Sequence, residues 1–405
     1  MLPSRQLYAF VVALLWGLSC GLPAFAGGPA MLRITNRLAL DRGDEVIEIP
    51  IAQVLAHAGI SSAQLDHLAV RDAVTHAPMT SQLYASHDGS APDTLLLLVH
   101  LRARASEDLA FTVEQQIPHF QARVFGREAP ERKDDFAWEN QQVTYRVYGP
   151  ALQATGEITS GIDVWSKRVP NFVIDSFYKR DALGARTHDP ELSYHKDNGQ
   201  GLDSYYVGPT RGCGGTAVFR QGKLFVSKNY TTNRIVANGP IRFAFDLAYA
   251  PWDADGVQVT ETKRVILDAG THLNRITSTY VFAGGGPLNL AAGIAIHPGA
   301  QPSIPVPDEI AAVWDSPQDP TAGRIATGLI ALPNQHAHTE IAAGHALMLF
   351  QRKSGMPFTY FAGSGWSKAD MPTAAAWSRY LQRELARHES PIQYAWHDRS
   401  PHKMD

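Results

Sequence analysis

The residue types best suited to chemistry gather between Asp163 and Tyr230. This segment combines histidine, lysine, arginine, tyrosine and tryptophan with many glycines, and little of it shows a strand or helix period. Long irregular segments on a rigid scaffold are uncommon, and they often carry function. Arginine and lysine side chains bind carboxylates, and a tryptophan ring offers an apolar face to a sugar ring. The segment therefore predicts a site for an acidic sugar.

Cleavage of a uronic acid by β-elimination needs three kinds of group. A cation neutralises the carboxylate, a base removes the proton at C5, and an acid protonates the departing oxygen. The segment offers His195 as the base, a tyrosine as the acid, and Arg211 or Lys228 as the cation. The predicted catalytic set is His195, Tyr205, Arg211, Lys228 and Tyr230, with Tyr178 and Tyr206 as further tyrosine candidates. The predicted substrate-binding set is Trp165, Lys167, Lys196, Tyr206 and Trp366.

Each of these residues also has a structural interpretation. A lone histidine in a polar loop, such as His195, is more often a hydrogen-bonding or solvent-facing residue, and Trp165 suits a core equally well. The tyrosines are candidate site residues only because they cluster with basic groups. Glu139 and Glu261 are an alternative pair of carboxylates for glycoside hydrolysis, whose separation the sequence does not give.

Other histidines are weaker candidates. His336 and His338 would share one face of a strand and so could bind a metal, but no second cluster matches them and a structural role is favoured. His297 ends a predicted strand and could face a cleft. No phosphate loop, dinucleotide fingerprint, zincin motif or nucleophile elbow is present. We expect no cofactor and no metal.

The elements that must position these residues are mostly strands. In the segment Phe136–Tyr148, a predicted hairpin, Val143, Tyr145 and Val147 alternate with polar or larger residues, the two-residue period of a half-buried strand. Further strands are predicted at residues 45–51, 94–100, 109–113, 241–249, 257–267, 273–282, 288–297, 324–332, 346–351 and 358–362. So many strands in meander order predict stacked antiparallel sheets.

Helical signal is limited to two places. Residues 51–58 could form one helix, and residues 373–388 form another with Trp377, Tyr380, Leu381 and Leu385 at helical spacing. Residues 118–135 are polar, proline-containing and highly charged at their end, which is typical of a linker. We expect a small N-terminal β region over residues 27–117, this linker, and a large β-sandwich domain over residues 136–405 with one peripheral C-terminal helix.

Composition excludes several function classes. The net charge of -3 argues against a nucleic-acid partner, and 44% hydrophobic with 19% charged residues is typical of a globular protein with a real core. Only Cys20 and Cys213 occur. Cys213 lies in a glycine-rich turn, where a small apolar filler is favoured over a nucleophile.

The first 26 residues predict export. Arg5 precedes the apolar run Tyr8–Cys20, and the segment closes on a small-x-small pattern at Ala26, after which cleavage is expected. The run is shorter than the roughly 20 residues that span a bilayer. Glycine at position 17 disfavours a lipoprotein anchor through Cys20. We expect a periplasmic or secreted protein without a membrane span and, since Cys20 is removed, without an internal disulfide.

Several longer motifs resemble a known bacterial family of exported proteins. They include Glu131–Asn140, Arg146–Pro150, Gly161–Lys167, Tyr194–Asp197, Gly208–Gly215, Tyr249–Trp252 and Gly363–Lys368. The family is the one described as domain of unknown function 4861, and the resemblance covers nearly all of the chain after residue 26. Its members resemble proteins encoded beside enzymes that degrade pectin and other uronate-rich polymers. The strand order is also similar to the galactose-mutarotase-type supersandwich, which several polysaccharide lyases share.

Residues and resemblance together predict an exported, mainly β protein that acts on an acidic, uronate-containing poly- or oligosaccharide. A lyase working by β-elimination is the favoured activity. A glycoside hydrolase, an epimerase or mutarotase, and a non-catalytic carbohydrate-binding protein remain open. Convergence of His195, Arg211, Lys228 and a tyrosine in one cleft would favour an enzyme, whereas scattered side chains would favour binding or a structural role.

Overall fold

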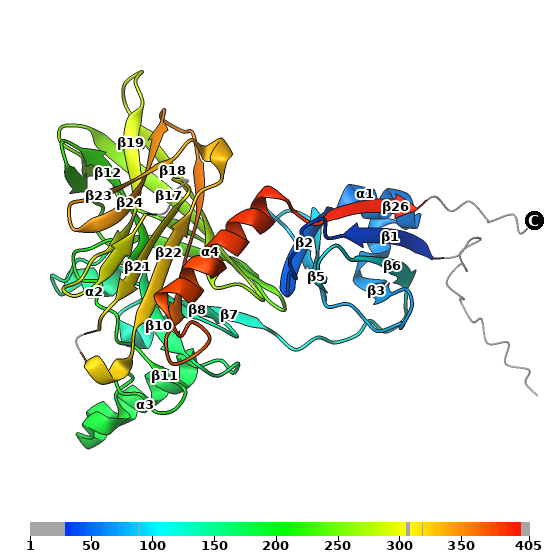
Figure 1. The fold of residues 1–405 in the computed structure, drawn as a ribbon, viewed down its shortest axis with the longest axis horizontal. Helices are drawn as coiled ribbons and strands as arrows, with labels where there is room; N and C mark the ends of the chain where they lie inside the picture. The colour runs from blue at the N-terminus through cyan, green and yellow to red at the C-terminus, as the bar shows by residue number, and fades with distance from the viewer. Residues whose placement is uncertain (1–28, 88, 305–307, 318, 398–405) are drawn as a thin grey trace, which may run out of the picture.

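The computed structural model describes residues 29–87, 89–304, 308–317 and 319–397. Figure 1 shows two parts side by side, a large β-rich domain and a smaller one that carries the N-terminal strands. Strands hold 44% of the residues and helices 17%, and the sheets are antiparallel, which confirms the predicted mainly β class. The predicted signal segment, residues 1–26, lies outside the described residues.

Both ends of the described chain meet in the small domain. The C-terminal strand β26 pairs with the first strand β1, so that Leu32 stands opposite Trp396 (Figure 1). Leu32, Ile34, Leu97 and Leu109 are fully buried in its core. Its elements are β1 Ala30–Thr35, β2 Asp44–Pro50, α1 Ile51–Ala58, β3 Leu68–Asp72, β4 Ser81–Tyr84, β5 Thr94–His100, β6 Ser106–Val113 and β26 Gln393–His397. They form the sheets β26-β1-β6-β3 and β2-β5-β4.

A nine-stranded sheet forms the first layer of the large domain. Its order is β14-β15-β17-β18-β25-β22-β21-β20, with β16 paired to β17. In β15, Phe243, Phe245 and Leu247 point into the core because alternate side chains lie on opposite faces of a strand. The strands are β14 Thr232–Asn238, β15 Arg242–Ala248, β16 Trp252–Asp253, β17 Gln258–Asp268, β18 Leu273–Phe282, β20 Gln301–Ser303, β21 Ile310–Asp315, β22 Ile325–Ile330 and β25 Phe358–Trp366.

Two five-stranded sheets share the second layer. Both contribute to the main core: Trp138 packs 4.8 Å from Phe245, and Phe350 packs 4.6 Å from Phe358, measured between ring centroids. A parallel bridge between Ile162 and Gly212 links their neighbouring edges. The first sheet, β11-β10-β9-β8-β7, comprises β7 Val124–Ala129, β8 Asp135–Asn140, β9 Thr144–Val147, β10 Asp163–Lys167 and β11 Gly201–Leu202. The second, β13-β12-β19-β24-β23, comprises β12 Cys213–Arg220, β13 Lys223–Phe225, β19 Leu288–Ala295, β23 His338–Ala342 and β24 His345–Arg352.

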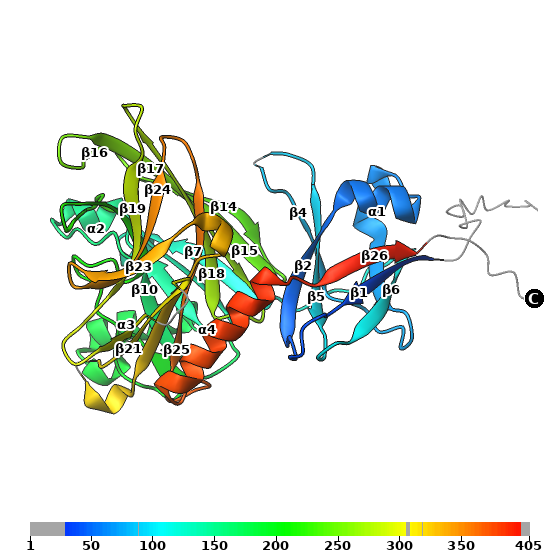
Figure 2. The same ribbon diagram turned by 45° about the horizontal axis from the view of Figure 1, so that its top comes forward.

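Helices cover the outer faces of this sandwich. α4 (Ala374–Glu389) begins where the Thr373 hydroxyl accepts a hydrogen bond from the Ala376 N–H, a typical N-cap. Its buried Trp377 and Leu381 pack on the outer face of the nine-stranded sheet. Figures 1 and 2 show α4 lying across the large domain and running toward the small one. The remaining helices are α2 Pro150–Ala154 and α3 Ile174–Thr187, and short 3-10 turns include η2 Pro130–Arg132, η3 Pro190–Leu192, η4 Pro320–Ala322 and η5 Pro333–Gln335.

The predicted strands and both predicted helices are found within a few residues of their expected bounds, but the structure differs in three places. β7 occupies part of the predicted linker and pairs with β8. β26 leaves the large domain and joins the small one. The segment Asp163–Tyr230, in which little regular structure was predicted, contains β10, α3, β11, β12 and β13. In α3 only Ile174, Phe177 and Tyr178 follow helical spacing, a single turn of signal that sequence reasoning missed.

Candidate active site

The strands β8, β9 and β10 present one apolar face and one charged face. Arg146 stands opposite Ala137 on β8 and Asp163 on β10, which sets all three on the same face. Alternate residues point the other way into the main core, among them Phe136, Trp138, Tyr145 and Val164. The charged face carries Asp135, Glu139, Thr144, Arg146, Tyr148, Asp163 and Lys167.

Arg146 contacts three carboxylates on this face. Its Nη2 lies 2.6 Å from Asp163 Oδ2 and 2.9 Å from Asp203 Oδ2, and its Nη1 lies 3.5 Å from Asp135 Oδ2. None of these four side chains is more than 7% exposed. The guanidinium also donates to the Tyr194 hydroxyl at 3.2 Å. One positive charge faces three acids, so full ionisation of all three would leave a buried excess of negative charge.

Burial and repulsion therefore keep protons in this group. Burial raises the pKa of Asp135 to about 6, although the charges of Arg146 and Arg132 oppose the shift. The pKa of Asp203 is raised well above its ordinary value, first by burial and then by the charge of Asp163. Burial therefore favours the protonated form of Asp203, whereas Asp135 is mostly ionised at neutral pH. Two carboxyl groups pushed to different pKa values are the usual arrangement of a general acid and a general base.

This acid cluster opens into a cavity of about 730 Å³, a volume typical of small-molecule sites. Asp203 Oδ1 and Arg132 Nε are buried, and neither has a hydrogen-bond partner within the described residues. Because buried polar atoms are ordinarily paired, both are available to a bound ligand. Other lining residues include Lys133, Asp135, Arg146, Tyr148, Tyr194, His195, Tyr205 and Tyr206.

His195 stands at the mouth of the cavity with its side chain 60% exposed. Its Nδ1 lies 2.9 Å from the backbone carbonyl of Asp203. A carbonyl only accepts, so Nδ1 donates in this contact and Nε2 of the neutral ring is left to accept a proton. The hydrogen bond ties the imidazole to the backbone of Asp203.

A second ion cluster lies on the same face and is fully buried. Lys167 Nζ lies 2.7 Å from Glu139 Oε2, and both side chains are fully buried. The backbone N–H groups of Val173 and Ile174, at the start of α3, donate to the same carboxylate at 2.8 and 2.9 Å. A helix N-terminus with free N–H groups favours such an anion. This pair joins α3 to the sheet and does not line the cavity beside Arg146.

The family comparison agrees with the sequence motifs. The family described as Domain of unknown function (DUF4861) matches residues 34–393. The chain belongs to this family. The membership expected from the motifs is thereby confirmed. A curated relative, Uncharacterized protein P7 of Formosa agariphila, is 29% identical over 379 residues, which are 90% of this chain and 92% of the relative.

Two solved structures from Enterococcus faecalis align over most of the chain. A protein in the Glycosyl Hydrolase Family 38 aligns at 10% identity with a TM-score of 0.45, covering 94% of this chain and 49% of that one. An alpha-mannosidase aligns at 9% identity with a TM-score of 0.47, covering 92% and 46%. The chain thus spans about half the length of these two structures.

Of the ten residues in the predicted catalytic and substrate-binding sets, three line the cavity: His195, Tyr205 and Tyr206. The further candidate Tyr178 is buried in the packing between α3 and the sheet. Arg211 lies elsewhere, with its buried guanidinium donating to the Ser160 hydroxyl and the Thr216 carbonyl, and burial lowers its pKa to about 10. The predicted convergence of His195 with Arg211 in one cleft therefore does not occur.

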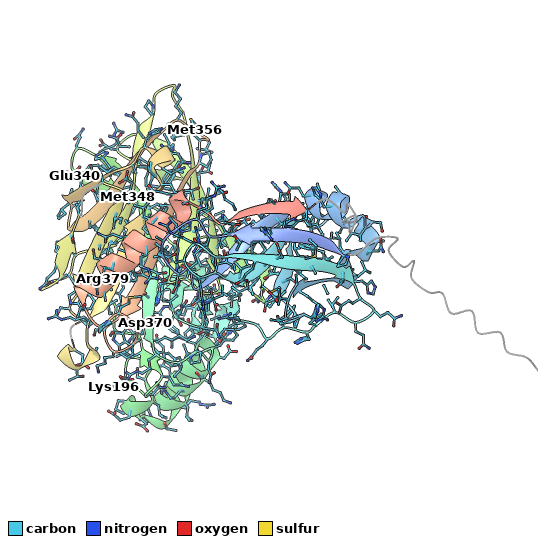
Figure 3. All side chains as sticks on the ribbon, turned by 45° about the vertical axis from the view of Figure 1, so that its right-hand side comes forward. Lys196, Glu340, Met348, Met356, Asp370 and Arg379 are labelled. Carbon is cyan, nitrogen blue, oxygen red and sulfur yellow. The ribbon has the colours of Figure 1, made fainter. Side chains whose placement is uncertain are left out.

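The remaining predicted residues fall into two groups. Trp165, Lys167, Tyr230 and Trp366 are buried; Tyr230 donates to the Asp134 carbonyl, and Trp165 packs against the α3 residue Phe177. Lys196 and Lys228 are exposed. Figure 3 places Lys196 beside α3, at one end of the large domain. Neither lysine lines the cavity.

The acids and the central arginine were missed. Asp135 ends the predicted linker, Arg146 lies in the predicted hairpin, and Asp203 lies in the irregular segment. The sequence pattern that indicates this site is the polar side of the hairpin, where Thr144, Arg146 and Tyr148 alternate with core residues. A charged strand face in a protein this rich in strands must be covered or must line a site.

The other sequence candidates lie apart from this cavity. Glu139 and Glu261 occupy separate buried networks, and Glu261 accepts hydrogen bonds from the hydroxyls of Thr216 and Ser278 at 2.6 and 2.8 Å. Neither therefore pairs with the other across a substrate site. Among the described residues, no group of three or more His, Cys, Asp or Glu side chains is placed to hold a metal ion, His336 and His338 included.

Two further residues have structural surroundings. His297 contacts Asp315 and packs edge-on against Tyr205, which supports the loop that lines the cavity. Burial raises the pKa of the Cys213 thiol to about 12, so it stays protonated and is a poor nucleophile. In the described part of the chain, no helix is long and apolar enough to cross a membrane.

Proposed function

We propose that this protein is a carbohydrate-active enzyme that cleaves a glycosidic bond by acid–base catalysis in the Arg146 cavity. One observation carries the proposal: two carboxyl groups share one guanidinium at the wall of a cavity of about 730 Å³. Burial raises the pKa of both, that of Asp203 well above its ordinary value and that of Asp135 to about 6. Tyrosines beside the acids supply the flat faces and hydroxyl groups that sugar rings contact.

The chemistry follows from the two protonation states. Asp203 gives its proton to the glycosidic oxygen as the bond from that oxygen to the anomeric carbon breaks. Asp135 accepts a proton from the water whose oxygen bonds to that carbon, so the two carboxyl groups exchange states. Solvent at the cavity mouth then restores them. Arg146 holds both acids in place and keeps Asp135 ionised near neutral pH.

The substrate proposed is an acidic, uronate-containing oligosaccharide or polysaccharide. Arg132, Lys133 and His195 line the cavity and provide cationic or hydrogen-bonding groups for a carboxylate. The buried Arg132 Nε, which has no partner in the described chain, supports this assignment.

A second candidate activity, β-elimination, is favoured by the position of His195. Its free Nε2 could remove the C5 proton of a uronate while Arg132 neutralises the carboxylate and Tyr205 or Asp203 protonates the departing oxygen. The C5–H and glycosidic C–O bonds break, and a double bond forms within the sugar ring. This mechanism keeps the predicted base and replaces Arg211 and Lys228, which do not line the cavity, with Arg132 as the cation.

A panel of uronate-containing and neutral oligosaccharides tests both activities. Hydrolysis produces new reducing ends without ultraviolet absorbance, and elimination produces an unsaturated product that absorbs. A change in anomeric or epimer ratio without cleavage would replace both with an epimerase or mutarotase. Saturable binding without turnover on every substrate, persisting in Asp203→Asn, would replace them with a non-catalytic carbohydrate-binding protein.

We also propose that the protein is exported and acts outside the cytoplasm. The apolar run and the small-x-small pattern at Ala26 support this. N-terminal sequencing of the mature protein from its natural host tests it, with Gly27 expected first; retention of Met1 and fractionation with the cytoplasm would contradict it.

A further inference from the structure

We propose that a groove at the junction of the two domains binds a carboxylate or sulfate group of an acidic carbohydrate chain, as a second site separate from the Arg146 cavity. The groove has a volume of about 430 Å³. It is lined by α4, by the turn of the β8–β9 hairpin at Gln141–Gln142 and by the stretch Arg42–Asp44 of the small domain. Single residues from elsewhere complete the lining: His100, Arg123, Gly270, His272, Asp370 and Met371. Its identity as a sugar site rests on the function proposed above.

Most of the charged groups that line this junction groove are paired, and one arginine is left for a ligand. Four arginines, Arg42, Arg123, Arg383 and Arg387, stand against three carboxylates, those of Asp44, Asp370 and Glu384. Arg42 is fully buried, whereas Arg383 is exposed and reachable by a ligand. Arg42 pairs with Glu45, Arg123 with Asp44 and Arg387 with Glu384. Arg383 has no carboxylate partner within the described residues, so an anion entering the groove meets its unpaired charge.

His272 and Asp370 line the same groove and contact each other. The Nδ1 of His272 lies 2.9 Å from the Ser364 carbonyl and its Nε2 lies 2.7 Å from Asp370 Oδ2. Despite burial, hydrogen bonding to His272 holds the pKa of Asp370 below its ordinary value, which keeps that carboxylate ionised.

Donors in the groove remain available. Arg387 Nε is buried and has no hydrogen-bond partner among the described residues, and the side chain as a whole is 11% exposed. Arg383 donates to the Asp41 carbonyl at 3.3 Å, and a guanidinium offers five N–H donors in all. Two arginines one helical turn apart on α4 thus present free N–H groups toward the same space. Carboxylates and sulfates suit such planar, charge-assisted donors.

The hairpin connects this groove to the catalytic cavity. Gln141 and Gln142 at its turn line the groove, while Asp135, Arg146 and Tyr148 near its open end line the cavity. At about 3.3 Å per residue, the four to six residues from the turn to Arg146 and Tyr148 span roughly 13 to 20 Å. The two sites are therefore distinct, and a single oligosaccharide chain is the kind of ligand whose anionic groups could reach both.

Binding to Arg383→Ala and Arg383→Glu tests the inference, with Arg379→Ala as the matched control. Arg379 is an exposed arginine one turn away on the same helix, and it does not line the groove; Figure 3 labels it together with Asp370. The probes are a galacturonate tetramer, a neutral tetramer of similar length, and sodium sulfate. Calorimetric titration uses the full-length mature protein carrying Asp203→Asn, which prevents turnover.

We expect the galacturonate tetramer to bind about tenfold more weakly to Arg383→Ala, the size of one charge-assisted contact, and more weakly still to Arg383→Glu. Arg379→Ala should bind as the parent does, and the neutral tetramer should bind poorly throughout. Equal weakening in Arg379→Ala, or no weakening in either Arg383 variant, would overturn the proposal. Sulfate that binds with Arg383 dependence while the tetramer shows none would identify a site for a free inorganic anion and overturn the carbohydrate assignment.

The outcome is independent of the catalytic proposal. If no glycan is cleaved but the Arg383-dependent binding is present, the function proposed for the cavity fails and the groove stands. If glycans are cleaved and Arg383 has no influence on binding, the groove fails and the cavity stands.

Discussion

Two ion clusters lie on the same face of β8, β9 and β10, and they serve different purposes. The Glu139–Lys167 pair is fully buried, has one charge of each sign, and is completed by backbone N–H groups of α3. The Arg146 cluster has three carboxyl groups for one guanidinium, and a cavity adjoins it.

The difference lies in charge balance and access rather than in residue type. A buried pair with one acid and one base can only hold elements together, because its charges balance and a substrate does not reach it. An unbalanced cluster must keep protons that its acids would release in water, and the cavity brings a substrate to them. The same strand face therefore supplies a structural anchor at one end and a candidate active site at the other.

The largest expected effect is on turnover in Asp203→Asn. The amide keeps the shape of the carboxyl but has no acidic proton to give, so kcat should fall by about 10²- to 10⁴-fold. Asp197→Asn, in the exposed loop before β11, is the control and should keep kcat within about twofold. Single-turnover kinetics on the best substrate of the glycan panel measure both. Similar kcat values for the two variants would remove Asp203 from the mechanism.

The next largest effect is on stability in Lys167→Met. Glu139 would remain buried without its ammonium partner, and breaking such a pair costs about 3 to 5 kcal/mol of unfolding free energy. Arg168→Met, at the partly exposed Arg168–Asp197 pair, should cost under about 1 kcal/mol. Urea unfolding compares the two, and kcat of the folded fraction should stay near the parent value. A loss in Lys167→Met no larger than in Arg168→Met would contradict the anchoring role.

A smaller effect is expected in the pH dependence of the Arg146 cluster. With the pKa of Asp135 raised to about 6, kcat/KM should rise about tenfold per pH unit below that value and level off above it, because the ionised form is the base. A raised carboxyl pKa favours the protonated folded state. Stability from this group is thus greatest at low pH and falls as pH increases from about 4 to 6.

Asp135→Asn provides the control for both pH curves. The substitution should abolish the rise of kcat/KM with pH below about 6. It should also abolish the loss of unfolding free energy between about pH 4 and 6, and it should leave the Glu139–Lys167 pair unaffected. A limb near pH 6 that persists in Asp135→Asn would assign it to another group, with His195 the first to examine.

Much of the scaffold was predictable from local pattern. The alternation in β15 and in the β8–β9 hairpin, and the spacing of Trp377, Leu381 and Leu385 in α4, each appear within a few consecutive residues. α3 was missed because Gly184 and many polar residues follow its single apolar turn. β7 was missed because its charges and nearby prolines are typical of a linker, although pairing with β8 buries Val124 and Ala129.

The sequence by itself determined the mainly β class, the family and the loop that carries His195, Tyr205 and Tyr206, because these depend on neighbouring residues and contiguous motifs. Only the tertiary structure decided which side chains meet. Asp135, Arg146, Asp163 and Asp203 come from three strands and a loop, and strand register brings them together. Arg211 and Lys228 have suitable chemistry, but the fold turns one into the interior and leaves the other away from the cavity. Register and burial depend on contacts between distant segments, which no local pattern records.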